Sequence, residues 1–414
     1  MISISEAIQL VLGRVRAGAS ESVEMSEACG STLAEDLRAG ADVPGFRNSQ
    51  MDGFAVRASD LTGASADTPV RLEEGMTVAA GSDEPGRLLP GGAIPIMTGA
   101  ALPDDADAVV PVEDTRSADG KIEFTTNPDV NAFVRQPGMD LRRGETVLRR
   151  GRVLRPADIG LLASLGCETV LRSAPPRVAI LGTGDELVEV GKPLGFGQIH
   201  DSNAYVLAAA AAAAGAVPTR LGIISDDRAS LEAAFESVTG YDLVLSTGGV
   251  SVGKFDYVKE VLDGLGVDRL FWKVAQKPGK PVTFGQHSGG ALFFGLPGNP
   301  VSAMVCFELY VAPAIRAILR QTAVFRPAIE VELGEDIRTT DRFEELVRCK
   351  RSVQGGQVLA RRAGSQNSGA LHSLSHADCL VISPPGKGEL SCGERMLALD
   401  LTAGSGFRAE HPFS

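Results

Sequence analysis

The sequence predicts a multidomain protein of the α/β plus β class. Strands and helices alternate between residues 177 and 320, which is typical of a parallel-type sheet with helices on both faces. Short strand-like runs separated by Gly, Pro and Asp fill 43–138, and strand-and-turn patterns return in 326–414. These three observations predict one α/β domain, two small β domains and a helical or extended linker domain.

The 414 residues are enough for two to four domains. The linker domain is expected to be discontinuous, because similar patterns occur before and after the first β domain. The pair Pro175-Pro176 marks the boundary where the α/β domain begins. The expected ranges are 1–45 with 141–175 for the linker domain, 46–140 for the first β domain, 176–325 for the α/β domain and 326–414 for the second β domain.

Each element is predicted from the spacing of its apolar residues and from the Gly and Pro residues that bound it. Residues 1–45 are expected to be helical, because Ile4, Ile8 and Val11 recur on one face. A second helix is expected within 154–171, with Pro156 in its first turn. The expected strands of the first β domain are 70–72, 93–97, 108–112 and 121–124. In the α/β domain we expect strands from 177 and at 221–224, 243–245 and 291–295, and helices at 202–214 and 231–238.

Composition excludes several classes of protein. The formal charge of -12 argues against a general nucleic-acid binder, although it allows a local basic pocket for an anionic small molecule. The six cysteines are scattered without a C-x-x-C pair, which fits a reducing cytoplasm. The first residues predict an amphipathic helix rather than a signal peptide, and the alanine run 204–217 is too weakly apolar to span a bilayer. We therefore expect a soluble cytoplasmic protein.

Glycine turns at three predicted strand ends of the α/β domain indicate a binding site. Glycine lets backbone N–H groups approach an anion, and ligands of such sheets bind beyond the carboxyl ends of the strands. Asn299 before Pro300 predicts a helix N-terminus at the third turn, which favours phosphate. The glycines are Gly182, Gly184, Gly248, Gly249, Gly253, Gly295 and Gly298.

Acids and lysines accompany these turns. Carboxylates beside a phosphate cradle suggest a bridging hard cation such as Mg²⁺, and we favour that role for Glu186 and Asp256. Asp185 and Asp227 are interpreted as capping or surface acids. The segment WKVAQKPGKPVTF is a stiff loop with three lysines, which suits an anionic substrate but also fits a solvated basic turn. These lysines are Lys273, Lys277 and Lys280.

Other candidate residues give weaker signals on their own. In the first β domain, Asp52 lies in a Met-Asp-Gly turn, and turn acids are usually structural. His372 and His376 have the spacing of a metal pair on a helix, but no third ligand is near, and Cys379 is expected in a strand core. Ser251 has no evident base, so a serine nucleophile is not expected.

Taken together, the motifs resemble those of one family. SQMDGFAV, PIMTGA, GTGDEL, DSNAYVL, STGGVSVGKFDYVK, KPGKPVTFG and LPGNPVSA follow one another in this order, and QNSGALHSLSHADCLVIS lies near the C-terminus. The chain is similar over nearly its whole length to the molybdopterin molybdenumtransferases, the MoeA and gephyrin E-domain family. No single motif has to carry this resemblance.

The resemblance implies a fold, a reaction and partners. It implies an elongated homodimer whose active cleft lies between the α/β domain of one chain and the first β domain of the other. It implies Mg²⁺-dependent insertion of molybdate into adenylylated molybdopterin, which yields molybdenum cofactor and AMP. The expected partners are a molybdopterin adenylyltransferase and the recipient molybdoenzymes or their chaperones, with no nucleic acid and no membrane.

The resemblance also assigns site residues. In the first β domain it implies functional roles for Asp52, Thr98, Arg135 and Asp140. It implies that Glu186, Asp226 and Asp256 surround Mg²⁺ and the pyrophosphate, and that Lys277 and Lys280 lie near molybdate. Ser368 and one arginine, Arg342 or Arg348, are expected to contact the oxyanion. Further substrate-binding residues are expected at Lys273, Ser202, Asn203, Ser251, Pro297, Asn299 and Pro300, together with the strand-end glycines Gly182, Gly184, Gly248, Gly249, Gly253 and Gly298.

Two residues depart from the family pattern, and three rival functions are compatible with the sequence. Lys254 occupies a slot that is usually acidic in the family, and Met139 one that is often charged. The rivals are a molybdopterin adenylyltransferase, a tungstate-inserting homologue and a non-catalytic cofactor-binding scaffold. The MDG motif and the additional β domains argue against the first, and the lack of a fused domain argues against the last. Tungstate and molybdate are too alike for the sequence to separate them.

Overall fold

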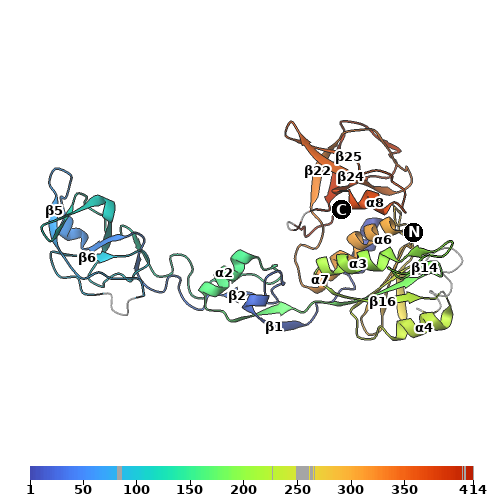
Figure 1. Ribbon diagram of the computed structural model, residues 1–414, viewed down its shortest axis with the longest axis horizontal. Coiled ribbons are helices and arrows are strands. Elements are labelled where there is room, and N and C mark those ends of the chain that lie inside the picture. Colours follow the sequence, from blue (N-terminus) through green and yellow to red (C-terminus); the bar gives the residue numbers. More distant parts are fainter. Residues whose placement is uncertain are drawn as a thin grey trace. The chain divides into compact units, whose positions relative to one another are not determined.

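The computed structural model describes residues 1–81, 86–225, 227–248, 261, 264, 266–402, 404 and 407–413. The chain forms two compact units. The first comprises 1–35, 150–156 and 169–414, and the second comprises 36–149 and 157–168. The multidomain α/β plus β architecture expected from the sequence is confirmed, and Figure 1 shows its elements along the chain.

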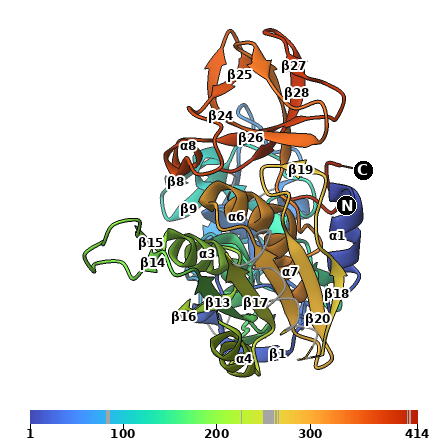
Figure 2. The same ribbon diagram turned by 90° about the vertical axis from the view of Figure 1, so that its right-hand side faces the viewer.

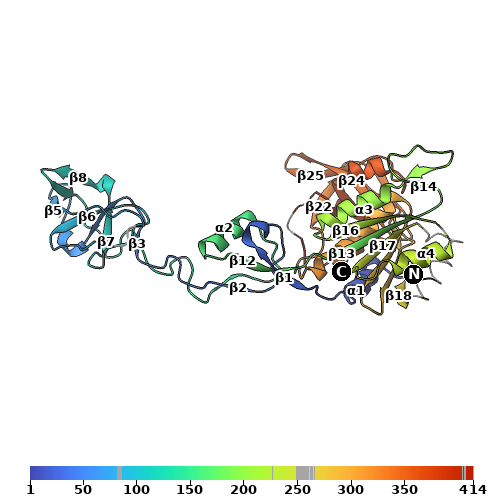
Figure 3. The same cartoon turned by 60° about the horizontal axis from the view of Figure 1, so that its bottom comes forward.

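The second unit is built around a six-stranded sheet with the order β7-β4-β6-β5-β9-β8. Alternate residues along these strands point to the same face of the sheet, and Phe54, Val56, Val110 and Phe124 pack together in one core. The sheet is visible in Figure 3. Its strands are β2 Leu37–Arg38, β3 Asn48–Ser49, β4 Gly53–Val56, β5 Val70–Glu74, β6 Gly92–Ile96, β7 Ala108–Pro111, β8 Thr115–Ala118, β9 Lys121–Phe124, β10 Val134–Arg135 and β11 Thr146–Leu148. Helix α2 spans Pro156–Ser164, and short 3₁₀ turns occupy Ala58–Leu61 (η2) and Val112–Asp114 (η3).

The first unit contains the α/β domain, whose six-stranded sheet has the order β16-β13-β17-β21-β20-β18. Its first four strands are parallel, whereas β20 and β18 add an antiparallel edge that the sequence did not indicate. The strands are β13 Arg177–Thr183, β16 Val217–Ile224, β17 Leu243–Thr247, β18 Val267–Phe271, β20 Thr283–His287 and β21 Leu292–Leu296. A short parallel pair, β14 Leu187–Val188 and β15 Ile199–His200, follows β13 in the sequence.

Helices cover both faces of this sheet, as predicted (Figures 1 and 2). Along β13, Val178 and Ile180 enter the core beneath one set of helices, while Ala179 and Leu181 enter the core beneath α4. The helices of the first face are α1 Ile4–Leu12, α3 Ser202–Ala213, α6 Pro300–Cys306 and α7 Ala312–Ile318, and α4 spans Arg228–Glu236.

The prediction of helix throughout 1–45 is confirmed only for α1, which Ser3 and Glu6 cap reciprocally. After Gly13 the polar and apolar residues no longer follow a helical period. The chain instead forms β1 Ser20–Glu24, which pairs with β12 Thr169–Ser173, and the turn η1 Met25–Glu27.

A continuous helical stretch, Pro300–Ile318, forms the centre of the α/β core and includes the π-helical turn η4 Phe307–Val311. By length and composition alone this stretch could cross a membrane, but 89% of its most apolar 18 residues is buried inside the protein. Its apolar character is therefore that of a core helix.

The C-terminal β domain closes its strands into a barrel-like sheet, because β24 pairs with both β25 and β26. The α/β domain contributes one strand to it, since β19 Gln276–Lys277 pairs in parallel with β24. The remaining elements are β22 Ala328–Leu333, β23 Ile337–Arg338, β24 Glu344–Gln354, β25 Gln357–Arg362, α8 Leu371–Ser375, β26 Cys379–Ser383, β27 Glu389–Leu390 and β28 Arg395–Asp400.

Candidate active site

The turns after β13, β17 and β21 meet at one edge of the α/β sheet, as their positions at parallel strand ends predict. Gly248 has a φ of +86°, and a Cβ there would lie 2.2 Å from the carbonyl oxygen of Thr183. A Cβ on Gly298 would lie 3.7 Å from the Cα of Gly248. Glycine is therefore required at Gly248 both by the backbone angle and by the close approach of the neighbouring strand.

The N-terminus of α3 joins this edge. Asp201 caps the helix by accepting a hydrogen bond from the backbone N–H of Ala204 at 3.1 Å. The side-chain amide of Asn203 donates to the carbonyl of Gly298 at 2.8 Å. Its Oδ1 is buried and has no hydrogen-bond partner among the described residues. Ser202 is the first helical residue and is half-buried.

Two glycines at the end of β13 and just after it make room for carboxylates. A Cβ on Gly182 would lie 2.7 Å from a carboxylate oxygen of Asp201, and one on Gly184 would lie 2.7 Å from a carboxylate oxygen of Glu186. Glu186 is exposed at the strand end, whereas Asp201 is almost fully buried. The sequence interpretation missed Asp201, although an Asp directly before a helix is a capping signal.

A second part of the site is a cavity of about 830 Å³ between the loop 276–281 and the C-terminal β domain. Among the described residues, four cationic side chains line it, Lys277, Lys280, Arg342 and Arg348, against the single carboxylate of Glu345. We call it the cation cavity. Pro297, Asn299 and Ser368 also line it, so it adjoins the turn that follows β21. The structure thus brings together residues that are far apart in the sequence.

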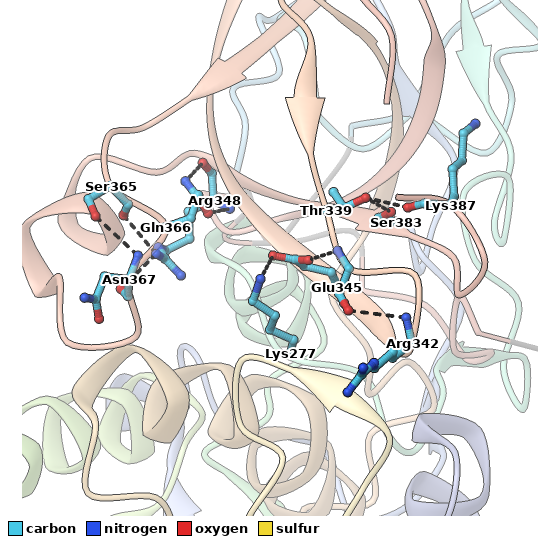
Figure 4. Close-up of polar contacts among 11 residues, drawn as sticks. Lys277, Thr339, Arg342, Glu345, Arg348, Ser365, Gln366, Asn367, Ser383 and Lys387 are labelled. Atoms are coloured by element: carbon cyan, nitrogen blue, oxygen red, sulfur yellow. Dashed lines mark hydrogen bonds and ion pairs between the residues drawn. The ribbon is translucent and has the colours of Figure 1, made fainter. Parts of the chain in front are cut away.

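Lys277 and Glu345 form an ion pair in the cation cavity (Figure 4). The lysine Nζ lies 2.9 Å from Oε1 of Glu345, whose side chain is only 6% exposed. The second carboxylate oxygen accepts a hydrogen bond from the backbone N–H of Thr340 at 2.6 Å. Glu345 is a second residue that the sequence interpretation missed. Its contact with Lys277 depends on the pairing of β19 with β24. A strand of two residues is too short to be recognised from the sequence pattern.

Arg348 is the better anchored of the two candidate arginines. It is 1% exposed, and its guanidinium donates to Ser373 Oγ at 2.8 Å and to the carbonyls of Ser365 and Asn367 at 2.9 and 3.1 Å. Burial is the main cause that lowers the pKa of Arg348. These bonds fix the loop that carries Ser368, as Figure 4 shows for its neighbours. Arg342 also lines the cavity, but its side chain is exposed.

The loop with Ser368 lies against the start of α6. The carbonyl of Ser368 accepts a hydrogen bond from the backbone N–H of Val301 at 3.2 Å. Asn299 is the N-cap, as predicted, with Pro300 as first helical residue, but its side chain makes no capping hydrogen bond within the described chain. The helix N-terminus therefore already has a carbonyl partner.

Lys273 takes a different position from the other two lysines. Its Nζ lies 4.4 Å from the centre of the Trp272 ring, a cation–π contact. The Nζ of Lys280 lies 5.1 Å from the centre of the Phe343 ring, at the cation cavity. The stiff loop expected from the sequence thus presents Lys277 and Lys280 to one cavity, while Lys273 lies on an aromatic side chain.

The predicted residues of the first β domain lie in the second unit. Oδ1 of Asp52 accepts hydrogen bonds from the backbone N–H of Thr98 at 2.7 Å and from its hydroxyl at 2.8 Å. These two bonds, the backbone one first, hold the pKa of Asp52 below its ordinary value. Arg135 ends β10, which pairs with β3, and Asp140 donates its backbone N–H to the carbonyl of Val43 at 2.9 Å. Both side chains are exposed.

Several predicted site residues lie outside the described part of the chain, namely Asp226, Gly249, Ser251, Gly253 and Asp256, together with Lys254. Within the described part, no three His, Cys, Asp or Glu side chains gather in a way that could hold a metal ion. The rings of His372 and His376 pack against each other at a tilt of 31° with centres 4.2 Å apart, and Cys379 is buried in β26, as expected.

Comparisons with known proteins agree with this arrangement. Three family models match the chain: the MoeA N-terminal region (domain I and II) over residues 2–166, a probable molybdopterin binding domain over 179–317, and the MoeA C-terminal region (domain IV) over 330–401. A molybdopterin molybdenumtransferase of Bacillus subtilis is 36% identical, over 100% of this chain and 96% of the relative. One from Nostoc is 35% identical, over 92% and 89%.

A solved structure gives the same result for the fold. The molybdopterin biosynthesis MoeA protein from Pyrococcus horikosii superposes with a TM-score of 0.84 and 30% identity, covering 98% of this chain and 100% of that one. The resemblance inferred from the motifs is thereby confirmed from the first helix to the last β domain. The chain belongs to the MoeA family of enzymes, the molybdopterin molybdenumtransferases.

Proposed function

We propose that this protein inserts molybdate into adenylylated molybdopterin and releases AMP. The observation that carries the proposal is the cation cavity, where two lysines and two arginines face one carboxylate of the described chain, beside the glycine turns of the α/β sheet. Molybdate is a small tetrahedral dianion, and clustered lysine and arginine donors are suited to oxygen atoms of such an anion. The relatives are named molybdopterin molybdenumtransferases, which supports a site for a molybdenum oxyanion.

Each part of the site has a separate task in this proposal. Lys277 and Lys280 bind the oxyanion, and Arg348 holds the loop on which Ser368 approaches it. The turns at Gly184, Gly248 and Gly298 give the pyrophosphate close access to backbone N–H groups. In a homodimer, Asp52 of one chain would meet the substrate held by the other, and its carboxylate, whose pKa Thr98 lowers, would orient the substrate or accept a proton from it.

The proposed Mg²⁺ fits the donor chemistry at the strand ends. Glu186 is an exposed carboxylate folded over Gly184, and carboxylate oxygens are the ligands that Mg²⁺ prefers. Asp226 and Asp256 would complete the set, although both lie outside the described residues. When bound, the ion would withdraw charge from the phosphoanhydride.

The decisive experiment measures AMP release from adenylylated molybdopterin with Mg²⁺ over a range of molybdate concentrations. The double variant Lys277→Ala, Lys280→Ala is expected to raise the half-saturating molybdate concentration by about tenfold or more, because it removes two charge-assisted contacts. Lys350→Ala is the matched control, since Lys350 is an exposed lysine of the same β24 strand that lines the cavity. It should behave as wild type.

The other outcomes separate the rival functions. AMP release that does not depend on molybdate would contradict the proposal, and no release at all would favour a cofactor-binding scaffold. Equal or better turnover with tungstate would identify a tungstate-inserting homologue. Loss of molybdate-dependent AMP release in Asp256→Ala, or a higher Mg²⁺ requirement, would support a metal role for that residue despite the neighbouring Lys254.

We further propose that the protein acts in the cytoplasm as a homodimer that receives its substrate from a molybdopterin adenylyltransferase and delivers product to molybdoenzymes or their chaperones. The apolar residues around Asp52 support a partner at that surface, because Met51, Met97 and Phe133 are 36%, 51% and 43% exposed. Sedimentation equilibrium should give twice the chain mass of 43.2 kDa, and a monomer would contradict the shared cleft.

A further inference from the structure

A buried polar group lies directly beneath the turn that carries Lys277 and Lys280. Tyr310 donates its hydroxyl to Oε1 of Gln276, and Nε2 of Gln276 donates to the carbonyl of Pro278 at 2.9 Å. The thiol of Cys306 donates to the carbonyl of Gly279 at 3.4 Å. Tyr310, Gln276 and Cys306 are all at most 1% exposed. We call these three residues the polar shelf.

The turn packs closely against the polar shelf. Lys277 and Lys280 are exposed, whereas Pro278 and Gly279 between them are buried. Gly279 has a φ of +93°, and a Cβ there would lie 2.5 Å from Cys306 Sγ and 2.7 Å from Gln276 Nε2. The two buried carbonyls thus each receive a side-chain hydrogen bond, while the two lysines project into the cation cavity.

The carbonyl of Pro278 and the hydroxyl of Tyr310 bind the two ends of the Gln276 amide. A side-chain amide has one accepting and one donating end, and only the donating end can bond a carbonyl. Because the Pro278 carbonyl can only accept, Nε2 faces it, and Oε1 is held from the other side by the hydrogen bond that Tyr310 donates. Burial raises the pKa of Tyr310 well above its ordinary value and also raises the pKa of the Cys306 thiol, so both groups remain donors.

Tyr310 itself is held by the central helix. It lies in the π-helical turn η4, and its ring packs against Phe271 with centres 6.2 Å apart. Phe271 belongs to the edge strand β18 and to the same core. A π-helical turn shifts the side chains that follow it, and such turns occur frequently at functional sites.

We propose that Tyr310, acting through Gln276, is a positioning residue that sets the spacing and direction of Lys277 and Lys280 for binding the oxyanion. The proposal rests on the function proposed above, because it assumes that these lysines bind molybdate. It predicts that a hydroxyl outside the cation cavity controls the affinity for a ligand that it does not touch.

The test compares Tyr310→Phe with wild type in two assays, equilibrium dialysis with sodium molybdate and the molybdate dependence of AMP release. The variant should weaken molybdate binding and raise the half-saturating concentration by about five- to tenfold, the effect of losing one buried hydrogen bond. Turnover at saturating molybdate should stay within about twofold, because the lysines themselves remain.

Phe271→Leu is the control, because it loosens the packing around the Tyr310 ring and keeps the hydroxyl. It should lower the thermal midpoint at least as much as Tyr310→Phe and leave molybdate affinity unchanged. An equal loss of affinity in Phe271→Leu, or wild-type affinity in Tyr310→Phe, would overturn the proposal.

The lysine double variant separates this proposal from the function on which it rests. If Lys277→Ala, Lys280→Ala loses molybdate binding and Tyr310→Phe does not, only the positioning role fails. If the double variant binds molybdate as wild type does, the oxyanion assignment fails, and the positioning role fails with it.

Discussion

The hydrogen bonds of Asp52 show how a turn lowers the pKa of an exposed carboxyl group. Its carboxylate accepts two hydrogen bonds from one threonine, which lower its pKa although it is exposed. Since the pKa in the folded protein lies below the ordinary value, the stabilisation is present above that ordinary value. It is lost as the pH falls through the folded pKa. At neutral pH the group is therefore a carboxylate, as its proposed role requires.

We predict that Thr98→Val raises the pKa of Asp52 part of the way to its ordinary value. The hydroxyl bond is lost, while the backbone N–H bond, which has the larger effect, is kept. Carboxyl carbon shifts measured by NMR over an acidic pH range would follow the titration. Asp227, whose pKa is lowered by Ser230, provides an internal control that should not move. An unchanged pKa of Asp52 would show that the hydrogen bond from the Thr98 hydroxyl has no influence on it.

Among the secondary-structure elements, the strand ends of the α/β sheet depend on one close backbone approach. The turn after β17 passes so near Thr183 that Gly248 has no room for a side chain. The hydroxyl of Thr183 also donates to the carbonyl of Thr247 at 3.2 Å, which ties the ends of β13 and β17 together. Packing of backbone against backbone thus gathers the glycine turns at one edge.

Gly248→Ala should therefore destabilise the α/β domain far more than a positive φ alone would. The matched variant is Gly290→Ala, because Gly290 has a φ of +100° beside the same sheet, yet no atom of the described residues lies within 4 Å of where its Cβ would be. We expect Gly290→Ala to cost about 1 kcal/mol and Gly248→Ala at least about 3 kcal/mol in the free energy of unfolding. Chemical denaturation of both variants checks this difference, and equal losses would contradict the steric argument.

The sequence predicts regular elements well and contacts between distant segments poorly. The strands β13, β17 and β21 and the helix α3 follow from apolar period and glycine punctuation, and so does their shared edge. Lys277 and Lys280 are also predictable from the stiff basic loop. The ion pair with Glu345 is not, because it arises from tertiary pairing of β19 and β24. Residues 1–45 were overpredicted as helix because local period was extended past Gly13.

In the architecture of the molecule, the helical stretch Pro300–Ile318 links the parts of the first unit. Glu308 in its π-helical turn accepts two hydrogen bonds from Arg326, at 2.8 and 2.9 Å, and its side chain is 5% exposed. Arg326 also donates to the carbonyl of Leu401 at 3.2 Å, close to the end of the last strand. One ion pair therefore connects the core helix with both ends of the C-terminal β domain.

We predict that Glu308→Gln lowers the free energy of unfolding by about 3 kcal/mol, because it removes the charge of the carboxylate that accepts two hydrogen bonds from the mostly buried guanidinium of Arg326. The control is Glu330→Gln, whose partner Arg395 lies 3.3 Å away with both side chains 67% exposed. Such an exposed pair should contribute well under about 1 kcal/mol. Denaturant unfolding followed by circular dichroism would compare the two, and equal effects would contradict a linking role for Glu308.

The pairing of β19 with β24 also has a consequence for the order of events during synthesis. β19 leaves the ribosome well before β24, and the walls of the cation cavity include residues up to Ser368. Domains fold as units while the chain emerges, from the N-terminus onward. The α/β domain can therefore fold first, yet its lysine turn gains Glu345 and the remaining walls only when nearly the whole chain has been made. A nascent chain halted before residue 340 would carry both lysines and no closed cavity.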